Sequence, residues 1–389
     1  MRESGKNPVS HRPRALVICG IRCVDLGTRP RRSSLPSLPH SLTPFVPSAL
    51  AACVACLAGV AGCVTPPRTL TAPQRQEIET RCVEFLKRGL TYEYNPAVRT
   101  QAVEAMQEVA DETTLPWLRA AVADSHPGVR FAACVALGVR RDSVCRQAIE
   151  GRLNDTDRSV RLAAVFALHR LGDTSRSGEL AERLLSDADP LVRRNAALLI
   201  GLLEEPGAAG VLARAMRDRD AGVQNHALES MAVLGVSEAR DQLVFLANGG
   251  IGSQEVFAIN ALARLRSREL ADLFRSKVAN AVHLETKLAA ARALGMLNLA
   301  EGAELARGIV RRGQRFPALD PDDTTADRTL RVHMLAIAAL GAAGDDGDLW
   351  TLDRLMRNNA DPRLQVSAAR AILEIQRRRS AALPFPAAR

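Results

Sequence analysis

Histidine is the side chain in this sequence best suited to hold a metal ion or to act as a general base near neutral pH. The seven histidines lie at positions 11, 40, 126, 169, 226, 283 and 333. None is part of a His-Glu-x-x-His motif, the spacing that places two imidazole rings on one helix face as zinc ligands. We therefore expect solvated or locally hydrogen-bonded histidines, with no metal ligand and no catalytic group among them.

Cysteine is the second residue type that could carry chemistry, as a nucleophile, a metal ligand or a disulfide partner. Of the eight cysteines, five lie at or before Cys63, and Cys82, Cys134 and Cys145 remain. An odd group of three is no disulfide framework. Cys134 and Cys145 fall on consecutive predicted helices and could pair in an oxidising compartment. Small buried thiols are the alternative that we favour.

Motifs for nucleotide binding and nucleophilic catalysis are also missing from the sequence. Gly250-Ile-Gly252 has two glycines of a dinucleotide-binding fingerprint but lacks the third glycine and the strand before it. The chain has no Gly-x-x-x-x-Gly-Lys phosphate loop and no Gly-x-Ser-x-Gly nucleophile elbow. The prediction is a protein without a cofactor, a small-molecule substrate or a catalytic residue.

The basic excess of the chain is concentrated at its N-terminus. The formal net charge is +9, but residues 1–62 hold eight of the 52 basic side chains and only two of the 43 acidic ones. The rest of the chain is therefore close to neutral, and aromatic residues make up 3% of the sequence. Such a composition is a poor match for a phosphate backbone and for base stacking. We expect no nucleic-acid partner.

A repeated segment supplies the framework that would position these residues. Asp187-Ala-Asp-Pro-Leu-Val-Arg-Arg-Asn-Ala-Ala-Leu-Leu-Ile-Gly201 recurs in related form at Asp155-Thr-Asp-Arg-Ser-Val-Arg161 and Asp124-Ser-His-Pro-Gly-Val-Arg130. The residue after each turn, apolar in most copies, marks the repeat, and the spacing between markers is 31 or 32 until one spacing of 44 and a last one of 34. The markers are Val98, Val129, Val160, Val192, Val223, Gln254, Thr286, Leu330 and Leu364. A fixed period of this size is typical of a helical solenoid.

Each copy has the pattern of two short helices. Within residues 179–186, Leu180, Leu184 and Leu185 give the first helix an apolar stripe. Asp189 suits the N-cap of the second helix, and Pro190 suits its first position, where no amide hydrogen is needed. Many inward positions are alanine, so one pair buries too little surface to fold alone, and neighbouring pairs must stack on it. The predicted fold class is all-α, an α-solenoid or superhelix of about nine antiparallel helix pairs.

The repeat also resembles a known family. The pattern Asp-x-Asp-Pro-x-Val-Arg-x-x-Ala-Ala-x-x-Leu-Gly is similar to HEAT repeats, and the period near 31 is most similar to the short HEAT-like repeats named after phycobilisome lyases. This resemblance implies a structural ladder, in which turn aspartates and the arginines after the valines bond along successive repeats. The ladder residues here would be Asp155, Asp187, Arg130, Arg161 and Arg193. HEAT-like di-iron hydroxylases carry repeated His-Glu dipeptides, and this sequence has none.

The N-terminal segment has the order of a secretory signal, which is basic, then apolar, then small residues. Arg29-Pro-Arg-Arg32 comes before an uncharged stretch, and residues 48–63 are an apolar run that ends in Val60-Ala-Gly-Cys63. These four residues are similar to the lipobox of bacterial lipoproteins. The resemblance implies cleavage before Cys63, lipidation of Cys63 and, because Val64 follows it, sorting to the outer membrane. A short transmembrane helix or a simple apolar tail is the alternative.

These features predict a division of the chain into five parts, each described here as it is expected from the sequence. Residues 1–47 are a disordered or mis-called N-terminal extension, because a signal that runs from Met1 to the residue before Cys63 would be far longer than the usual length of about 15–30 residues. Residues 48–63 are the lipoprotein-type signal segment, and 64–75 a Pro/Thr tether. Residues 76–380 are the HEAT-like solenoid, and 381–389 a disordered tail.

The long spacing between the markers Thr286 and Leu330 places about a dozen extra residues in one loop between helices. Insertions in a solenoid map to one face, often the binding face. We predict that the head of this insertion contacts a partner protein, through Arg311, Arg312, Arg315 and Phe316. The alternative is a tolerated surface insertion in which the arginines pair with the acidic residues that follow, Asp320, Asp322, Asp323 and Asp327.

Together these observations predict a non-catalytic scaffold that presents a long curved surface to another protein. It would be lipid-anchored in the cell envelope, at the periplasmic face of the outer membrane. A cytoplasmic chromophore lyase or lyase-like chaperone, implied by the repeat subtype, is the enzyme-class alternative. A HEAT-like DNA glycosylase or other nucleic-acid binder is a third hypothesis, which the near-neutral charge disfavours. No residue of the sequence identifies the partner.

Overall fold

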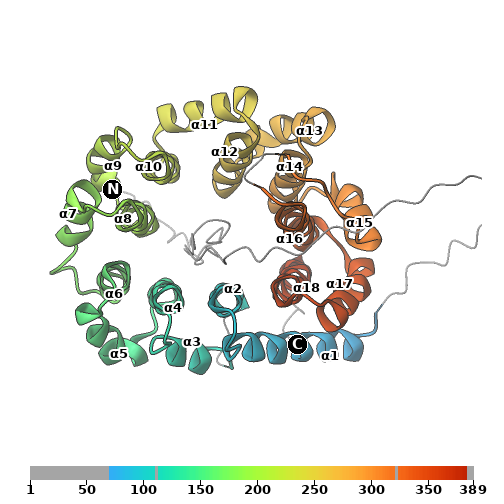
Figure 1. The fold of residues 1–389 in the computed structure, drawn as a ribbon, viewed down its shortest axis with the longest axis horizontal. Coiled ribbons are helices and arrows are strands. Elements are labelled where there is room, and N and C mark those ends of the chain that lie inside the picture. Colours follow the sequence, from blue (N-terminus) through green and yellow to red (C-terminus); the bar gives the residue numbers. More distant parts are fainter. Residues whose placement is uncertain (1–69, 110–112, 320–322, 383–389) are drawn as a thin grey trace, which may run out of the picture.

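The computed structural model describes residues 70–109, 113–319 and 323–382, and these residues form helices and turns without a strand. Their eighteen α-helices follow one another as nine pairs. The odd-numbered helix of each pair lies on the outside of a ring and the even-numbered helix on the inside (Figure 1). The predicted all-α solenoid of about nine helix pairs is confirmed for this part of the chain.

In most pairs the outer helix is shorter than the inner helix. The outer helices are α1 (Ala72–Leu90), α3 (Leu115–Ala121), α5 (Arg146–Gly151), α7 (Gly178–Ser186), α9 (Ala209–Ala215), α11 (Ser237–Gly249), α13 (Ala271–Asn280), α15 (Ala303–Arg312) and α17 (Asp346–Asn358). The inner helices are α2 (Pro96–Val109), α4 (Pro127–Arg140), α6 (Arg158–Arg170), α8 (Pro190–Leu203), α10 (Ala221–Val233), α12 (Gly252–Arg264), α14 (Leu284–Met296), α16 (Thr325–Ala343) and α18 (Pro362–Ala382). Short 3-10 turns lie at Ser143–Cys145, Arg152–Asn154, Pro206–Ala208 and Arg268–Leu270.

Two aspartates build the turn before α8. The carboxylate of Asp187 accepts a hydrogen bond from the backbone N–H of Asp189 at 3.0 Å. Asp189 in turn caps α8 by accepting from the N–H of Leu191 at 2.9 Å. Pro190 takes the first helical position, where no amide hydrogen is required. The same two-step turn opens α6 and α10, so the Asp-x-Asp pattern determines where these inner helices begin.

Small residues bring successive inner helices into close contact. Four inward-facing residues of α8 are buried as predicted, namely Val192, Ala196, Leu199 and Ile200. Gly295 of α14 lies against the backbone of α16, where an added Cβ would come within 2.5 Å of the carbonyl carbon of Ala342. Gly172, after α6, has a φ of +95°, a conformation that suits glycine at a helix end. The glycines of the repeat therefore serve either close packing or helix termination.

The solenoid closes on itself, which the sequence analysis did not predict. The last inner helix, α18, packs against both α1 and α2 (Figure 1). The guanidinium of Arg81 in α1 lies 3.2 Å from the carboxylate of Asp353 in α17. Gln376 in α18 donates to the backbone oxygen of Arg75 in α1 at 3.0 Å. The first and last pairs therefore cover one another, and neither is left as an open end.

Two of the expected boundaries fall differently in the structure. Residues 72–75, the end of the expected tether, form the first turn of α1, because Thr71 and Gln74 cap each other's backbone N–H groups there. Helix α18 extends to Ala382, into the expected tail 381–389. The expected extension 1–47 and signal segment 48–63 lie outside the described residues. Among the helices of the described residues, none combines the length and the apolar character needed to cross a membrane.

Candidate partner-binding site at the insertion before α16

The insertion found in the sequence occupies residues 313–324, between α15 and α16, of which 320–322 are outside the described part of the chain. Helix α15 ends at Arg312, and the next residue, Gly313, has a left-handed φ of +59°. Helix α16 begins after Thr324, whose hydroxyl caps it by accepting from the N–H of Asp327 at 3.0 Å. The Thr324 cap therefore fixes the residue at which the insertion ends and the inner helix α16 begins.

Phe316 anchors the insertion to the ring instead of facing outward. Its side chain is only 6% exposed, and its ring meets the imidazole of His333 edge to face, with centroids 5.8 Å apart. Its backbone N–H donates to the hydroxyl of Thr329 at 2.9 Å. The prediction that Phe316 contacts a partner is therefore corrected. An aromatic residue in an irregular loop gives no periodic signal from which its burial could be predicted.

An ion pair ties the insertion to the neighbouring repeat. The guanidinium of Arg328 in α16 donates to the carboxylate of Glu285 in α14 at 3.0 Å and to the backbone oxygen of Pro317 at 2.7 Å. Burial pushes the pKa of Glu285 upward, but the hydrogen bond from Arg328, a backbone hydrogen bond and the charges of Arg328 and Arg331 together outweigh it and hold that pKa below its usual value. Glu285 is therefore charged at neutral pH, and the loop is attached to both α14 and α16.

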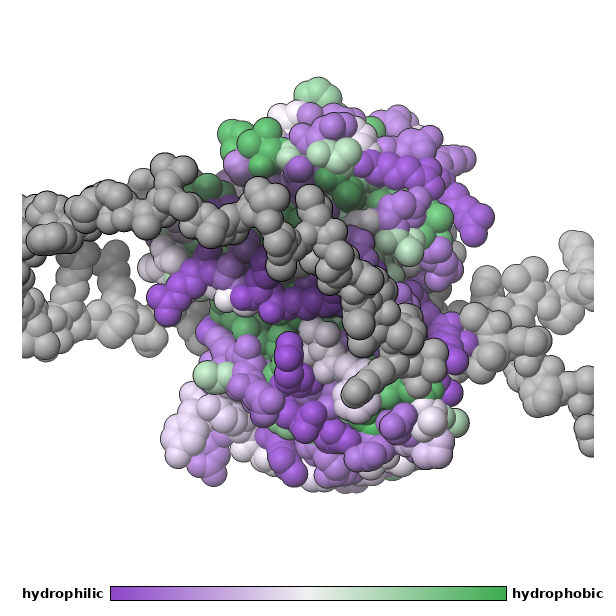
Figure 2. Space-filling model, turned by 90° about the vertical axis from the view of Figure 1, so that its right-hand side faces the viewer, coloured by the Kyte–Doolittle hydropathy of each residue, from purple (hydrophilic) through white to green (hydrophobic). Residues whose placement is uncertain are grey.

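The three arginines predicted at the head of the insertion remain at the surface, two of them in the last turn of α15 and Arg315 in the insertion itself. The side chains of Arg311, Arg312 and Arg315 are exposed, and none forms an ion pair with an acidic residue of the described part. Asp323 pairs with Arg331 of α16 at 2.5 Å instead. The surface on this side of the ring is mainly hydrophilic, with apolar residues in separate patches (Figure 2). Among the described residues, the alternative in which the basic head pairs with the acidic tail is therefore not realised.

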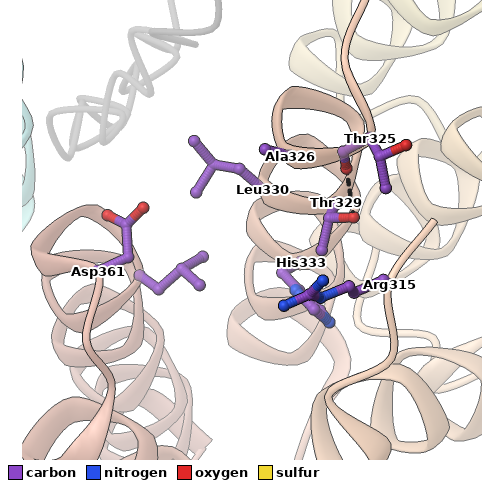
Figure 3. Close-up of a pocket in the computed structure, with 8 residues that line it drawn as sticks. Arg315, Thr325, Ala326, Thr329, Leu330, His333 and Asp361 are labelled. Carbon is purple, nitrogen blue, oxygen red and sulfur yellow. Dashed lines mark hydrogen bonds between the residues drawn. The ribbon is translucent and has the colours of Figure 1, made fainter. Parts of the chain in front are cut away.

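A pocket of about 460 Å³ opens next to these arginines, between the starts of α16 and α18 (Figure 3). Arg315 reaches it from the insertion, and Asp361 borders it at the start of α18. The remaining lining residues are Thr325, Ala326, Thr329, Leu330, His333 and Leu364. Leu330 and Leu364 were predicted only as repeat markers, and His333 only as a solvated or locally hydrogen-bonded histidine. The other three residues were not predicted to belong to a site. The spacing of these residues in the sequence does not indicate that the starts of α16 and α18 are separated by a pocket.

The charges around the pocket leave it with a cationic end. The pKa of Asp361 is held below its usual value, because the hydrogen bonds from Arg363 outweigh the effect of burial. Arg363 pairs with this carboxylate at 2.7 Å and thereby neutralises it. Burial lowers the pKa of His333, which is therefore neutral at pH 7, and its Nε2 is buried without a hydrogen-bond partner. Arg315 is thus the uncompensated charge among the described lining residues, beside the apolar side chains of two leucines.

The residues of the expected ladder are partly brought together. Arg130 donates to the carboxylate of Asp155 at 2.7 and 2.9 Å, and Arg193 bonds Asp218 in the same way. Arg161 bonds only the backbone oxygens of its own turn, at 2.6 Å for Asp155. Asp187 is bonded instead by Arg158, at 2.8 Å. Asp187 lies one residue farther from Arg161 than Asp155 lies from Arg130. The reason is that the repeat from Val160 to Val192 is one residue longer than the repeat from Val129 to Val160.

The cysteines and histidines take structural positions in the described residues. Cys82, Cys134 and Cys145 are free, buried thiols, so the disulfide considered for the last two is not formed. Burial raises the pKa of Cys134 to about 12 and that of Cys145 to about 11. His126 caps α4 by accepting from the N–H of Gly128 at 3.1 Å. Within the described ranges, no three His, Cys, Asp or Glu side chains are grouped as a metal site. Cys63 lies outside them.

Comparison with known proteins identifies the repeats. Residues 83–175 and 177–249 match the family model for HEAT repeats. The first half of the solenoid is therefore similar to HEAT repeats, and the nine-pair solenoid continues beyond the matched residues to α18. No curated protein matches the chain.

Several solved structures are similar to this one. The complex of CpcE and CpcF of phycocyanin lyase from Nostoc sp. PCC7120 is 17% identical, with 64% of this chain and 93% of that chain covered and a TM-score of 0.38. Human deoxyhypusine hydroxylase in complex with glycerol is 18% identical, with coverages of 70% and 99% and a TM-score of 0.34. The Escherichia coli protein YibA is 15% identical, with coverages of 68% and 98% and a TM-score of 0.30.

Proposed function

We propose that this protein is a non-catalytic HEAT-repeat scaffold that binds another protein at the insertion before α16. The observation that carries the proposal is the set of three exposed arginines, Arg311, Arg312 and Arg315, beside the pocket between α16 and α18. None of them forms an ion pair within the described residues, so a partner could bond them without breaking such a contact of the fold. The buried Phe316 holds the loop in position for such contacts.

The proposal is tested by photo-crosslinking of the full chain in its native host. A photoreactive phenylalanine analogue is placed at Leu319 or Ala326, which lie at the insertion and the pocket, and as a control at Val144, which is exposed in the turn after α4. We expect one distinct protein to be crosslinked from the first two positions and not from Val144. If a panel of positions around the whole ring yields no specific crosslink, the scaffold function is wrong.

Attachment to the cell envelope is a second part of the proposal. It is supported by the order of residues in the sequence, a basic segment, an apolar run and Val60-Ala-Gly-Cys63. We propose that Cys63 carries a lipid and that the ring is held at the periplasmic face of the outer membrane. Cys63→Ser should release the protein from the membrane fraction. Intact residues 1–62 in the membrane-bound wild type, seen by mass spectrometry, would overturn the attachment but leave partner binding open.

A further inference from the structure

Large apolar side chains are exposed on three successive turns of the ring. Ile251, Val282 and Leu319 lie in the turns before α12, α14 and α16, with exposed fractions of 80%, 91% and 52%. The inner helices lie roughly along the line of view in Figure 1, and each is entered from the turn that follows an outer helix. These turns therefore share one face of the ring. We call the surface formed by these three residues with Arg311, Arg312 and Arg315 the apolar–basic face.

Contacts between the turns make this surface continuous. Gly252, at the start of α12, lies against the imidazole of His283 in the next turn. Glu285, at the start of α14, accepts from Arg328, which also donates to Pro317 in the insertion. The pocket, which Arg315 and Leu364 both line, then extends this surface from the insertion to the start of α18. A ligand lying along this face would therefore meet apolar side chains, free guanidinium groups and a concave site in succession.

On the opposite half of the ring, turn aspartates are engaged inside the fold. Asp124, Asp155 and Asp218 are each bonded by an arginine of the inner helix before them. Exposed arginines occur there too, at the turn before α10, namely Arg214, Arg217 and Arg219. No large apolar side chain is exposed in that turn among the described residues. These three arginines therefore offer a matched control with the same charge and the same place in the repeat.

We infer that the apolar–basic face binds an acidic segment of a partner protein, and that an apolar side chain of this segment enters the pocket between α16 and α18. The inference rests on the proposed function and specifies its partner. Carboxylates are the groups that exposed guanidiniums bond best, and they complement the positive ends of the inner helices, whose N-termini lie at this face. Leu330 and Leu364 offer the pocket an apolar wall, and Arg315 stands at its edge.

A bilayer with anionic lipids is the other surface that attracts arginines and exposed apolar side chains. The pocket favours a peptide over a bilayer, because an apolar side chain flanked by carboxylates can enter a concave site of this size while a flat headgroup layer lies across its mouth. Binding to an anionic bilayer is therefore tested as the alternative.

The test uses the full-length protein with the Cys63→Ser substitution, so that no lipid is attached, and a phage-displayed library of short random peptides as the probe. Selected peptides are resynthesised with a fluorophore, and their affinities are measured by anisotropy. Three variants are compared with this parent: R311E/R312E/R315E, the control R214E/R217E/R219E, and Ala326→Trp, which fills the pocket mouth from an exposed helix position. Vesicles of phosphatidylglycerol and phosphatidylcholine are tested in parallel.

We expect selected peptides to be rich in Asp and Glu around one large apolar residue. The triple substitution at the insertion should weaken their binding by at least about tenfold, and Ala326→Trp by at least about fivefold, whereas the control triple should change it by less than about twofold. Equal weakening by both triples, peptides without acidic residues, or binding to vesicles alone would overturn the inference. A cellular partner crosslinked elsewhere on the ring would also overturn it, together with the proposed binding site, while leaving a scaffold that binds its partner at another surface.

Discussion

The carboxylate of Glu108 in α2 accepts hydrogen bonds from the guanidinium of Arg370 in α18, across 262 residues of sequence. The pair lies where the two ends of the solenoid meet. Glu104 of α2 and Glu374 of α18 also act on this guanidinium, so three carboxylates lie near it. Arg292 of α14 and Arg378 of α18 act on Glu108 and Glu374 in turn. Charges at such a seam are favourable only while they offset one another, because burial removes most of their hydration. The closure of the ring therefore depends on Arg370.

Arg370→Met should destabilise the protein by about 2–4 kcal/mol, because it removes the guanidinium that bonds Glu108. Arg292 and Arg378, which also act on Glu108 and Glu374, then offset only part of the negative charge at the seam. Arg354→Met, at an exposed position of α17, is the matched control and should cost less than about 0.5 kcal/mol. Urea denaturation gives the free energy of unfolding of each variant. Similar values for the two variants would show that the seam contributes little to the stability of the ring.

The seam also predicts a dependence of stability on pH. Burial raises the pKa of Glu104 to about 7 from an ordinary value of 4.5; Arg370 lowers it and Glu108 raises it further. Because the pKa is higher in the folded state, the stabilising contribution is complete below about pH 4.5 and is lost as the pH rises through 7. The loss between these limits amounts to at most about 3 kcal/mol.

Glu104→Gln replaces this group by one that is neutral at every pH. Relative to wild type, the variant should therefore gain stability steadily between pH 5 and pH 8, by about 2–3 kcal/mol in total. The measurement is the free energy of unfolding of both proteins at pH 5, 6, 7 and 8. Taking the difference between them removes the contribution of all other titrating groups. A difference that stays constant over this range would contradict the raised pKa.

The architecture was predictable because each repeat contains, within a short segment, the capping residues and the apolar pattern that specify its helices. Asp189 and Pro190 specify a helix start, and Val192 begins an apolar stripe, so the pattern is complete between Asp187 and Gly201. Closure of the ring has no such local pattern. Arg81 and Asp353 are ordinary surface-type residues in their own helices, and only the cumulative curvature of nine pairs brings them together. Curvature depends on small rotations between pairs, which no short segment encodes.

The candidate site was predictable in position but not in detail. The long spacing between Thr286 and Leu330 located the insertion, and its three arginines are exposed as expected of a contact surface. The pocket was not predictable, because it depends on how far the starts of α16 and α18 separate. The prediction for Phe316 was wrong for a related reason, since its partner His333 lies on the following helix and not in the loop.

The two kinds of arginine in the repeat should differ in their effect on stability. Arg130 makes two hydrogen bonds to the buried carboxylate of Asp155 and another to the backbone oxygen of Asp124, whereas Arg161 bonds backbone oxygens only. Arg130→Ala should therefore cost about 2–4 kcal/mol, and Arg161→Ala about 1 kcal/mol. Denaturant unfolding of both variants checks the order. If Arg161→Ala is the more damaging, the bond from Arg130 to Asp155 is not what stabilises the stack.

Close packing of the inner helices gives the last prediction. An added Cβ at Gly295 would approach the backbone of α16 at Ala342 to 2.5 Å, and a backbone atom cannot move aside as a flexible side chain can. Gly295→Ala should therefore force α14 and α16 apart and cost about 1–3 kcal/mol. Gly210 in α9 has nothing within 4 Å of the corresponding position. Gly210→Ala should instead stabilise the protein by about 0.5–1 kcal/mol, since alanine is the better helix former. Thermal unfolding of the two variants should shift in opposite directions. Stabilisation of both variants would mean that helix propensity, and not the contact between α14 and α16, governs the outcome at Gly295.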